Sequence, residues 1–598
     1  MSSKKALPRY IDVACSRCET RCRLPLVDDE REIDQLLARQ LIFGGKKPLR
    51  KKVEDYAKEM LEAEGDCQGD RAHDVQINVS QEAVDYRIIY IRDPPLEMDK
   101  FEERVYQTTT AYAIGQPLPD PKKVKIRATV TTDPKNNIVL MVHAIEPVEE
   151  DFMGFKITEQ EKEDFIRYFQ SAKTLHRKIA PSQIAPRIVG REWEKLGVLL
   201  TLHSPMLIPD VTGDTIRGGI KAMFIGDTTT GKTEMLKDVS FGCYNLGEYN
   251  ACESTSRTGL TYTIDTDHDV LKWGSLVLND MGMVCLDGMQ DLPSRREMDK
   301  LTEALRTQRV VVRRYLQGEA PARTRILGSM NPPKGRPMKK YPFPCLVISG
   351  TAIFRSEKNI PRWDLFIPMK DEDVSVDDII TETPPERYVP VDVFKQHVHW
   401  VWSRTPDDIE YVEGAIDLIK SETTALIKTY KTARLPIVHN GYRDTVCRFS
   451  VATAALLHST DEEHQKIMVS EKHVRLATDY IRRMLDKLGL KEYRQLVEEE
   501  TELYDGELLV IIDRVDAIDL SILLQLSIGD HTSTELAEEV GIKPETIRGI
   551  HFRALRNLKL ITTQPGKGAS LTPKGAAFVE WVYEWKHVKT RLTHGGSS

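Results

Sequence analysis

The sequence predicts a multidomain α/β protein whose central part is a parallel β-sheet covered by helices. Three observations predict this fold class. A glycine-rich loop at residues 226–233 lies between a short apolar strand and the start of a helical pattern. A second apolar strand, at residues 284–287, ends in an acidic residue, and segments of β-rich and helical character flank the central part on its two sides. Alternating strands and helices of this kind are typical of a parallel sheet with helical layers.

Composition limits the classes of protein that need to be considered. A chain of 598 residues with 40% hydrophobic and 29% charged residues has the composition of an ordinary soluble protein of several domains. The net charge is −7, so any nucleic-acid binding must depend on local basic patches. The first residues lack the apolar run of a signal peptide and no stretch is long enough to span a bilayer, so we expect no membrane partner. We therefore expect the nine cysteines to be reduced.

Cysteines near the N-terminus suggest a zinc site. Cys15 and Cys18 form a C-x-x-C knuckle, with Cys22 close behind and Cys67 well downstream. Zinc takes four thiolate or imidazole ligands, and a two-residue gap allows one turn to present two of them. The predicted set is Cys15, Cys18, Cys22 and Cys67, with His73 as the alternative to Cys22. A metal-free, redox-inert cluster is the competing interpretation, because a second C-x-x-C is missing.

Residues 74–147 have the pattern of a small antiparallel β domain, either a barrel or a sandwich. Short alternating runs at 86–91, 124–130 and 138–142 are separated by proline- and asparagine-rich turns. Lys122, Lys123, Lys125 and Arg127 give one strand a basic face. This face either lines a nucleic-acid groove or is simply solvated. We assign residues 1–157 to this zinc-knuckle and β domain.

A charged helical segment begins at Thr158, and a proline-containing stretch follows it. We assign residues 158–195 to a helical linker and residues 196–500 to the central α/β domain with its lid. Within that domain, Val277-Leu278 and residues 283–286 are predicted as strands that alternate with helices.

The central loop fits the phosphate-binding pattern G-x-x-x-x-G-K-[ST] at every fixed position. Its residues are Gly226, Asp227, Thr228, Thr229, Thr230, Gly231, Lys232 and Thr233. The glycines let backbone N–H groups turn toward phosphates, and the following helix adds its positive dipole end. Lys232 is expected to reach the β- and γ-phosphates, and Thr233 to place its hydroxyl on Mg²⁺. The sequence therefore predicts binding of a nucleoside triphosphate, ATP, with Mg²⁺.

Three further residues suit the same site. Asp287 ends an apolar strand in the arrangement that holds Mg²⁺ directly or through water. Asn331 ends another strand and suits an amide that positions the attacking water. Arg362 lies in a turn from which it can reach the γ-phosphate of a neighbouring subunit. The position after Asp287 is Gly288, which has no group that accepts a proton, where such ATPases usually carry glutamate.

Residues 510–598 have the pattern of a winged helix, a helix–turn–helix followed by a β-hairpin. A helix over 515–526 precedes Thr532, which starts a capping box with Glu535. That second helix ends at Gly541, and a third opens at Pro544. Such domains bind duplex DNA or proteins with comparable frequency.

In their order and spacing, these motifs resemble those of the minichromosome maintenance (MCM) replicative helicases of the AAA+ class, in particular the archaeal type. The resemblance is strong over about residues 179–490. The segments that carry it are Arg217-Gly218-Gly219-Ile220, Thr258-Gly259-Leu260-Thr261, Gly274-Ser275-Leu276-Val277-Leu278-Asn279-Asp280, Leu286-Asp287, Ser329-Met330-Asn331-Pro332 and Pro361-Arg362-Trp363-Asp364-Leu365. It implies a ring, usually a hexamer or a mixed ring with another MCM chain. It also implies an OB-like fold for the N-terminal β domain, and a nuclear protein in a eukaryote or a nucleoid-associated cytoplasmic one in an archaeon.

The resemblance also implies roles for three arginines. Arg443 matches the family's sensor 2 arginine, which acts across the subunit interface. The family has a β-hairpin that points into the central channel, and here residues 310–315 lead into Gly318 and return over 322–327. Arg313 aligns with the basic residue of that hairpin and Arg314 adds a second charge, so both are expected to bind DNA, single- or double-stranded.

Departures from the family leave two functions open. Gly288 replaces the expected glutamate, and Asp291 and Glu253 are nearby acids that are candidates to substitute for it. We also expect the family's leading helical subdomain to be absent, and the second zinc knuckle is irregular. The first function is a ring ATPase that moves on DNA and separates its strands. The second is a nucleotide-gated DNA-binding or assembly factor of a replication complex that hydrolyses ATP weakly or not at all.

Overall fold

The computed structural model describes most of the chain from residue 154 to residue 579 and separate strands before it. The described residues are 5–8, 10–15, 21–26, 75–79, 81–92, 108–115, 124–133, 136–148, 152, 154–253, 259–266, 270–292, 295–314, 316–351, 353–354, 357–381, 383–432, 435–501, 511, 514–564, 568–579 and 582. The chain forms two compact units. The first comprises Met1–Tyr341, Leu346–Ala425 and Asn440–Met484, and the second Pro342–Cys345, Leu426–His439 and Leu485–Ser598.

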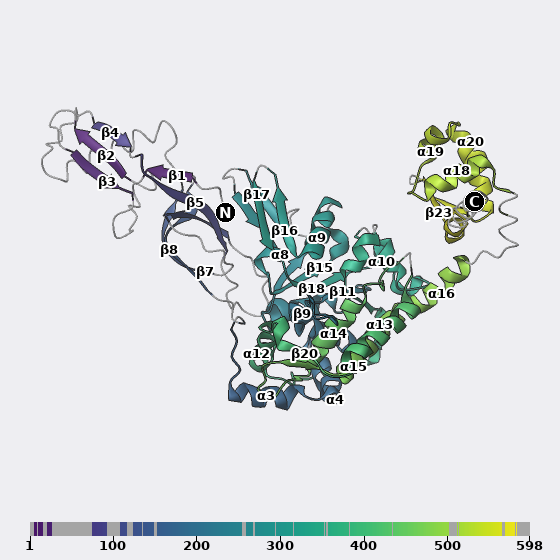
Figure 1. The fold of residues 1–598 in the computed structure, drawn as a ribbon, viewed down its shortest axis with the longest axis horizontal. Coiled ribbons are helices and arrows are strands. Elements are labelled where there is room, and N and C mark those ends of the chain that lie inside the picture. The colour runs from purple at the N-terminus through teal and green to yellow at the C-terminus, as the bar shows by residue number, and fades with distance from the viewer. Residues whose placement is uncertain are drawn as a thin grey trace, which may run out of the picture. The chain divides into compact units, whose positions relative to one another are not determined.

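A five-stranded parallel sheet forms the centre of the first unit, as the sequence predicts (Figure 1). Its strands, in spatial order, are β12 (Glu248–Ala251), β15 (Met283–Asp287), β18 (Arg325–Met330), β11 (Lys221–Gly226) and β19 (Leu365–Met369). Every residue of β11, β18 and β19 is buried. Parallel strands covered on both faces have such continuous apolar runs. All four ladders are parallel, so the carboxyl ends of the strands meet at one edge.

Helices and short ladders surround this sheet. The helices are α6 (Glu192–Leu202), α7 (Lys232–Lys237), α8 (Ser275–Leu278), α9 (Arg295–Thr307), α10 (Leu346–Gly350), α11 (Val376–Thr381), α12 (Val391–Trp402), α13 (Ala415–Tyr430), α14 (Arg443–Leu456) and α15 (Glu471–Lys487). The short ladders pair β9 (Leu207–Pro209) with β10 (Thr215–Arg217), β13 (Tyr262–Asp265) with β14 (Val270–Trp273), and β20 (Ile409–Tyr411) with β21 (Ile467–Val469).

The strand predicted at Val277-Leu278 is wrong, because these residues belong to the helix α8. Gly274 precedes the helix, and its carbonyl accepts from the amide of Leu278 at 3.0 Å. A Cβ at Gly274 would lie 2.5 Å from the carbonyl oxygen of Gly259, so only glycine allows this close approach. The Ser275 hydroxyl donates to Glu248 at 2.7 Å. These contacts come from distant residues, and two apolar residues alone cannot distinguish helix from strand.

The N-terminal residues form two sheets, in agreement with the predicted β character. β1 (Lys5–Pro8), β5 (Ala83–Arg92), β6 (Thr108–Ile114), β8 (Ile138–Pro147) and β7 (Val124–Thr132) form a five-stranded sheet in that order. The sheet is not antiparallel throughout as predicted, because β6 and β8 pair in parallel. β3 (Arg21–Pro25), β2 (Tyr10–Cys15) and β4 (Val75–Val79) form a three-stranded one. Lys125 and Arg127 are exposed on the edge strand β7, while Lys122 and Lys123 lie outside the described residues.

Of the predicted zinc ligands, only Cys15 and Cys22 lie among the described residues. Cys15 ends β2, and Cys22 lies in β3 opposite Val13, so one hairpin carries both. Cys18, Cys67 and His73 lie outside the described residues. Zinc therefore stays a prediction.

The segment predicted as a helical linker packs against the central unit. α3 (Glu159–Phe169) begins with a capping box between Thr158 and Glu161. α4 (Ala172–Thr174), a π-helical turn (Leu175–Ile179) and α5 (Ala180–Gln183) continue it. Phe165 and Phe169 are fully buried, and the Phe169 ring stacks on His397 of α12 with centroids 3.8 Å apart.

Next to these phenylalanines, four histidines form a hydrogen-bonded chain. His203 Nδ1 lies 2.7 Å from the Leu199 carbonyl, which only accepts, so this nitrogen carries the proton. His203 Nε2 then accepts from His397 Nδ1 at 3.1 Å, and His397 Nε2 from His458 Nδ1 at 3.3 Å. His458 Nε2 lies 3.0 Å from Nδ1 of His464. The first three imidazoles are fully buried, and His203 and His397 each donate through one nitrogen and accept at the other, as neutral imidazoles do.

Acid is therefore expected to destabilise the first unit. Burial lowers the pKa of His203 to about 4 and of His458 to about 3, and it lowers the pKa of His397 well below its usual value. In the unfolded chain these histidines bind protons near pH 6.5, whereas in the folded chain they stay neutral. The free energy of unfolding therefore decreases as the pH falls from 6.5 toward 4. Each histidine contributes a slope of about 1.4 kcal/mol per pH unit in this window. Urea unfolding at pH 7 and pH 5 measures this loss, and an unchanged midpoint would contradict it.

The second unit contains a separate small core. Its elements are α16 (Leu490–Thr501), α18 (Ala517–Leu526), α19 (Ser533–Val540), α20 (Pro544–Thr546), a π-helical turn (Ile547–His551), α21 (Phe552–Asn557), β22 (Ile561–Gln564) and β23 (Gly568–Leu571). Fourteen buried side chains, among them Leu523, Leu536 and Leu555, form one cluster. The capping box at Thr532 and the end of α19 at Gly541, with φ +76°, are confirmed. The order of helices and hairpin fits the predicted winged helix, which stays a prediction.

The surroundings of His551 indicate a structural role. It is buried and bonds Asp519 of α18 at 2.8 Å, so it does not face solvent from the third helix of this unit. Among the described residues, none of the helices has the length and apolar character needed to cross a bilayer.

Candidate nucleotide-binding site

The phosphate loop joins the carboxyl end of β11 to the start of α7, as predicted. Gly226 ends the strand beside β19, where a Cβ would lie 2.1 Å from the Met369 carbonyl oxygen. Gly231 has φ +89°, and a Cβ there would lie 2.9 Å from the Ile188 side chain. Glycine at both positions follows from these two close approaches. Thr228 and Thr229 are exposed, and the buried Thr230 donates to the Asp227 carbonyl at 2.9 Å.

Lys232 is buried under this loop. Its ammonium donates to the Gly226 carbonyl at 3.0 Å, to Thr230 Oγ1 at 3.1 Å and to the Asp227 carbonyl. Burial lowers the pKa of Lys232 to about 8, against the opposing effect of the Asp287 and Asp227 carboxylates. The ammonium is thus held by neutral acceptors, which form weak hydrogen bonds. The charged oxygens of a phosphate form stronger hydrogen bonds and can replace them.

Asp287 accepts hydrogen bonds from three hydroxyl groups at the carboxyl end of β15. Thr233 Oγ1 donates to it at 2.7 Å, Tyr249 of β12 at 2.8 Å, and Ser329 of β18 also donates. A carboxylate beside a threonine hydroxyl is a hard-oxygen donor set that suits Mg²⁺. The sequence motifs predict Thr233 and Asp287, but Tyr249 lies in no recognisable motif. Its role becomes visible only when β12 and β15 pair.

Asp227 fastens the loop to two other segments. Its carboxylate accepts from the backbone amides of Met338 at 2.7 Å and Asp371 at 3.1 Å. The loop conformation is therefore set by contacts far away in the chain as well as by its own glycines.

The chain reverses directly after Asp287. Gly288 has φ +69°, and its amide donates to Ser329 Oγ at 3.1 Å. The backbone amide of Asn331 donates to Gln290 Oε1 at 2.9 Å, so the end of β18 is tied to the turn that follows β15. The structure thus brings Lys232, Thr233 and Asp287 together and ties the backbone of Asn331 to the neighbouring turn.

Arg362 lies at the opposite end of the sheet. It ends a 3-10 helix (Glu357–Arg362) that precedes β19, and its Nε is buried without a hydrogen-bond partner among the described residues. β19 runs parallel to β11, with Gly226 paired to Met369. The phosphate loop follows the carboxyl end of β11, whereas Arg362 precedes the amino end of β19. A five-residue strand separates the two ends by about 15 Å.

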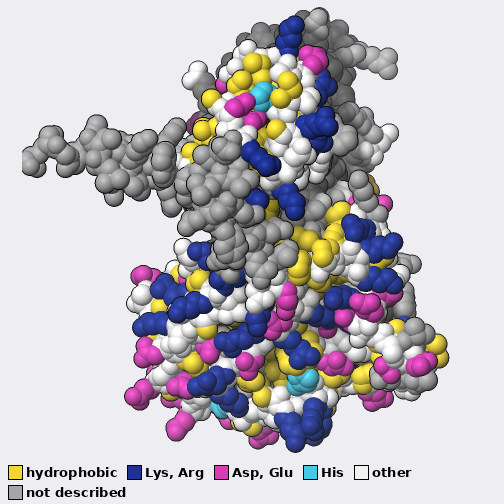
Figure 2. Space-filling view, turned by 90° about the vertical axis from the view of Figure 1, so that its right-hand side faces the viewer, with side chains coloured by type: hydrophobic (Ala, Val, Ile, Leu, Met, Phe, Trp, Pro, Cys, Tyr) yellow, Lys and Arg dark blue, Asp and Glu magenta, His cyan; other side chains and the backbone are white. Residues whose placement is uncertain are grey.

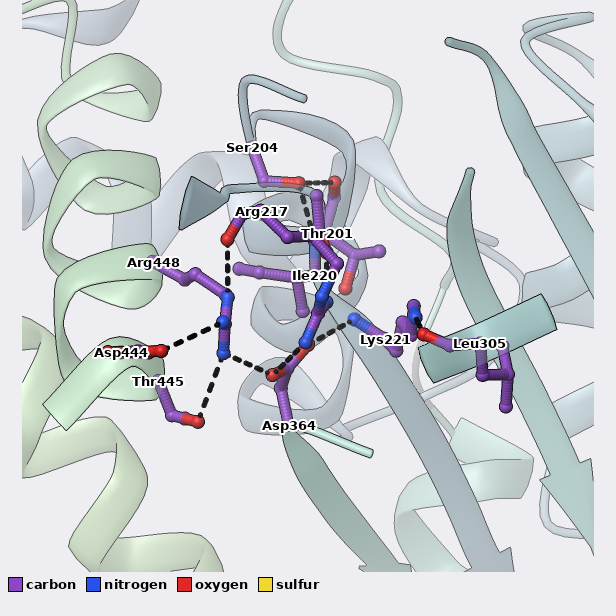
Figure 3. A network of polar contacts seen from close by, with 11 residues as sticks. Thr201, Ser204, Arg217, Ile220, Lys221, Leu305, Asp364, Asp444, Thr445 and Arg448 are labelled. Atoms are coloured by element: carbon purple, nitrogen blue, oxygen red, sulfur yellow. Dashed lines mark hydrogen bonds and ion pairs between the residues drawn. The ribbon is translucent and has the colours of Figure 1, made fainter. Parts of the chain in front are cut away.

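Two residues after Arg362, Asp364 is the centre of a buried network (Figure 3). Its carboxylate accepts from Arg217 at 2.7 and 2.8 Å, from Arg448 at 2.8 Å and from the backbone amide of Lys221 at 2.9 Å. Burial acts in the opposite direction, but the Arg217 and Arg448 guanidiniums hold the pKa of Asp364 well below its usual value. The sequence motifs contain Arg217 and Asp364 but give no sign of the pairing with Arg448.

Arg443 is paired within its own chain. Its guanidinium lies 2.9 Å from Asp210, and its side chain is 41% exposed. Burial opposes the shift, but hydrogen bonds from Thr212 and Asp214 and the Arg443 charge lower the pKa of Asp210.

The predicted hairpin is present, although its return strand is shorter and earlier. β16 (Arg309–Arg313) pairs antiparallel with β17 (Gln317–Pro321), and Arg313 lies opposite Gln317. The predicted return over 322–327 is wrong, because Arg325 starts the sheet strand β18. Gly318 consequently lies within β17 and not in the turn. Arg313 and Arg314 are exposed at the tip.

Comparison with known proteins gives matches to one family. Residues 162–382 match the family model described as the MCM P-loop domain. The DNA replication licensing factor MCM6 of Oryza sativa subsp. indica is 27% identical over 341 residues, 55% of this chain and 39% of the relative. Mcm6 of Drosophila pseudoobscura pseudoobscura is 30% identical over 157 residues, 25% of this chain and 19% of the relative. MCM5 of Arabidopsis thaliana is 30% identical over 188 residues, 30% of this chain and 25% of the relative.

The fold and the site define a P-loop nucleotide-binding core of the AAA+ kind. A five-stranded parallel sheet carries the phosphate loop after β11 and the acidic residue at the end of β15. With the matches above, residues 162–382 are an MCM P-loop domain, and the chain is related to the MCM proteins through this domain. The alignments span between about a fifth and two fifths of the length of these curated relatives.

Proposed function

We propose that this chain is a subunit of a ring-forming ATPase that acts on DNA during replication. The observation that carries this proposal is the pairing of Thr233 with Asp287 at 2.7 Å, directly beside the buried ammonium of Lys232. These groups would hold the phosphates and Mg²⁺ of a bound ATP. The metal would neutralise the charge on the β- and γ-phosphates. The relatives that the chain resembles are named as DNA replication licensing factors.

The position of Arg362 supports a site shared between subunits. Because it lies at the other end of the β11–β19 pair, it cannot reach the nucleotide of its own chain. Arg362 is only half-buried, so part of its side chain is accessible to a neighbouring molecule. We infer that Arg362 contacts the γ-phosphate bound by the next subunit. Arg443 would act at the same interface once its exposed contact with Asp210 is released.

One observation favours the second candidate, a nucleotide-gated assembly factor with little hydrolysis. Gly288 replaces the glutamate expected of such ATPases, and its φ of +69° disfavours any larger side chain. A Gly288→Glu substitution would therefore introduce backbone strain along with the missing carboxylate. Turnover must instead be examined through residues that the native chain already has.

DNA binding is proposed for the hairpin tip. On the face drawn in Figure 2, Lys and Arg side chains are intermixed with Asp and Glu side chains, in keeping with the net charge of −7. DNA binding must therefore depend on a few basic side chains at particular positions. Arg313 and Arg314 suit this role because both are exposed. In a ring these two residues recur in every subunit and would track the phosphates of one strand.

Replacing Arg313 and Arg314 together with alanine is expected to weaken single-stranded DNA binding at least about tenfold in the presence of an ATP analogue. The dependence of affinity on salt should also become shallower, because fewer counterions are released. Fluorescence anisotropy with a labelled oligonucleotide at several salt concentrations measures both effects.

The matched control is Arg306→Ala, which removes an exposed arginine from the last turn of α9. It should leave DNA affinity within about twofold of the native value. If the double variant binds DNA as the native chain does, or if ATP has no influence on binding, the proposed function is wrong.

A further inference from the structure

The turn after Asp287 brings an acidic side chain to the place where residue 288 lacks one. Gly288 adopts the left-handed conformation and starts a 3-10 turn (Met289–Asp291), so that the amide of Asp291 donates back to the Gly288 carbonyl at 3.0 Å. A Cβ built at Gly288 would lie 3.6 Å from Asp291 Oδ2. A glutamate's carboxylate oxygens lie at a similar distance from its own Cβ. Asp291 thus reaches the space that a glutamate at position 288 would explore.

Hydrogen bonds tie this carboxylate to the strand that ends at Asn331. Gln290 Nε2 donates to Asp291 Oδ2 at 2.6 Å, and Gln290 Oε1 accepts from the Asn331 amide at 2.9 Å. The same turn begins at Gly288, whose amide bonds Ser329, and Ser329 bonds Asp287. Asp291 is therefore connected through short polar contacts to the proposed metal ligand and to the proposed water-positioning residue. It is also exposed, so water has access to it.

A buried thiol, Cys252, lies near both carboxylates. Burial raises the pKa of Cys252 to about 12, and the charges of Asp287 and Asp291 add to this rise. The Cys252 amide donates to the Asp287 carbonyl at 2.8 Å, which places the thiol beside the end of β15. Both carboxylates thus lie near this end of β15. No hydrogen bond from Glu253, the other acid near this edge, to Asp287, Gln290 or Asn331 is found among the described residues.

We propose that Asp291 is the general base of ATP hydrolysis in this protein, in place of the glutamate that Gly288 replaces. This inference rests on the proposed function. Asp291 takes one proton from a water molecule as the water oxygen forms a bond to the γ-phosphorus. The bond between that phosphorus and the β–γ bridging oxygen breaks, and its electron pair leaves with ADP. Orthophosphate is the second product, and Asp291 then releases the proton to solvent.

The test is steady-state ATP turnover of the full chain with Asp291→Asn. Asparagine keeps an oxygen that accepts from Gln290 but removes the basic group. We expect the turnover number to fall at least about a hundredfold, while ATP affinity stays within about twofold. Asp291→Glu should retain a measurable part of the native rate.

The matched control is Glu253→Gln, which removes the other nearby acid and should leave turnover within about twofold. Native turnover in the Asp291→Asn variant would overturn the assignment, as would a native chain that binds ATP but does not turn it over. Failure of the proposed function gives a different result, because Lys232→Ala would then bind ATP as tightly as the native chain.

Discussion

Lys232→Ala is expected to weaken ATP binding at least about a hundredfold and to abolish turnover. The ammonium is buried among the Gly226 and Asp227 carbonyls and Thr230, directly under the loop that would cradle the phosphates. Removing it deletes the buried positive charge under the loop and leaves these acceptors without a donor. Charge-assisted contacts of this kind contribute more than neutral hydrogen bonds. Titration with a fluorescent ATP analogue measures the loss.

A matched variant separates this effect from a general loss of charge. Lys300→Ala removes a lysine from α9, where the ammonium lies 4.5 Å from the Tyr262 ring. Its ATP affinity should stay within about threefold of the native value. If Lys232→Ala retains native affinity, the loop does not bind the triphosphate.

Asp364→Ala is expected to destabilise the first unit by about 3–5 kcal/mol, because the buried Arg448 and the mostly buried side chain of Arg217 would lose their carboxylate partner. Asp364 is 3% exposed, and the Arg448 side chain is 9% exposed, so water cannot replace the lost partner. Urea unfolding of the nucleotide-free protein, followed by circular dichroism, gives the difference in free energy of unfolding.

Asp444→Ala is the control for this substitution. Asp444 also faces Arg448, but at 3.7 Å and with 36% of its side chain exposed. An exposed pair of this kind contributes about 0–1 kcal/mol. If both substitutions lower the free energy of unfolding equally, the buried network contributes no more to stability than the exposed ion pair.

The sequence is most informative where a function depends on neighbouring residues. Residues 226–233 are consecutive, so their spacing alone predicts a strand, a loop and a helix in the right order. Asp287 and Asn331 are predictable for a similar reason, since each ends an apolar strand. The partners of these residues are not predictable, because Tyr249 reaches Asp287 only through the pairing of β12 with β15.

The wrong expectations have a common physical cause. Val277-Leu278 is too short for its periodicity to distinguish helix from strand, and distant contacts at Gly274 and Ser275 decide the outcome. For the hairpin, residues 322–327 have apolar alternation that suits either a return strand or a sheet strand. Pairing of β18 with β11 and β15 assigns Arg325 to the sheet. Asp291 and Glu253 are equal candidates in the sequence, and only the left-handed turn at Gly288 favours Asp291 by bringing it back to the site.

Asp364 has a mechanical consequence for a ring built from this chain. Its carboxylate accepts from the amide of Lys221, the first residue of the strand that carries the phosphate loop, and it lies two positions after Arg362, which we propose contacts the adjoining subunit. The phosphate loop and Arg362 therefore lie at the two ends of one rigid pair of strands, β11 and β19. We therefore expect that binding of a triphosphate to the loop also displaces Arg362. Nucleotide bound at one subunit interface would then affect the next interface of the ring.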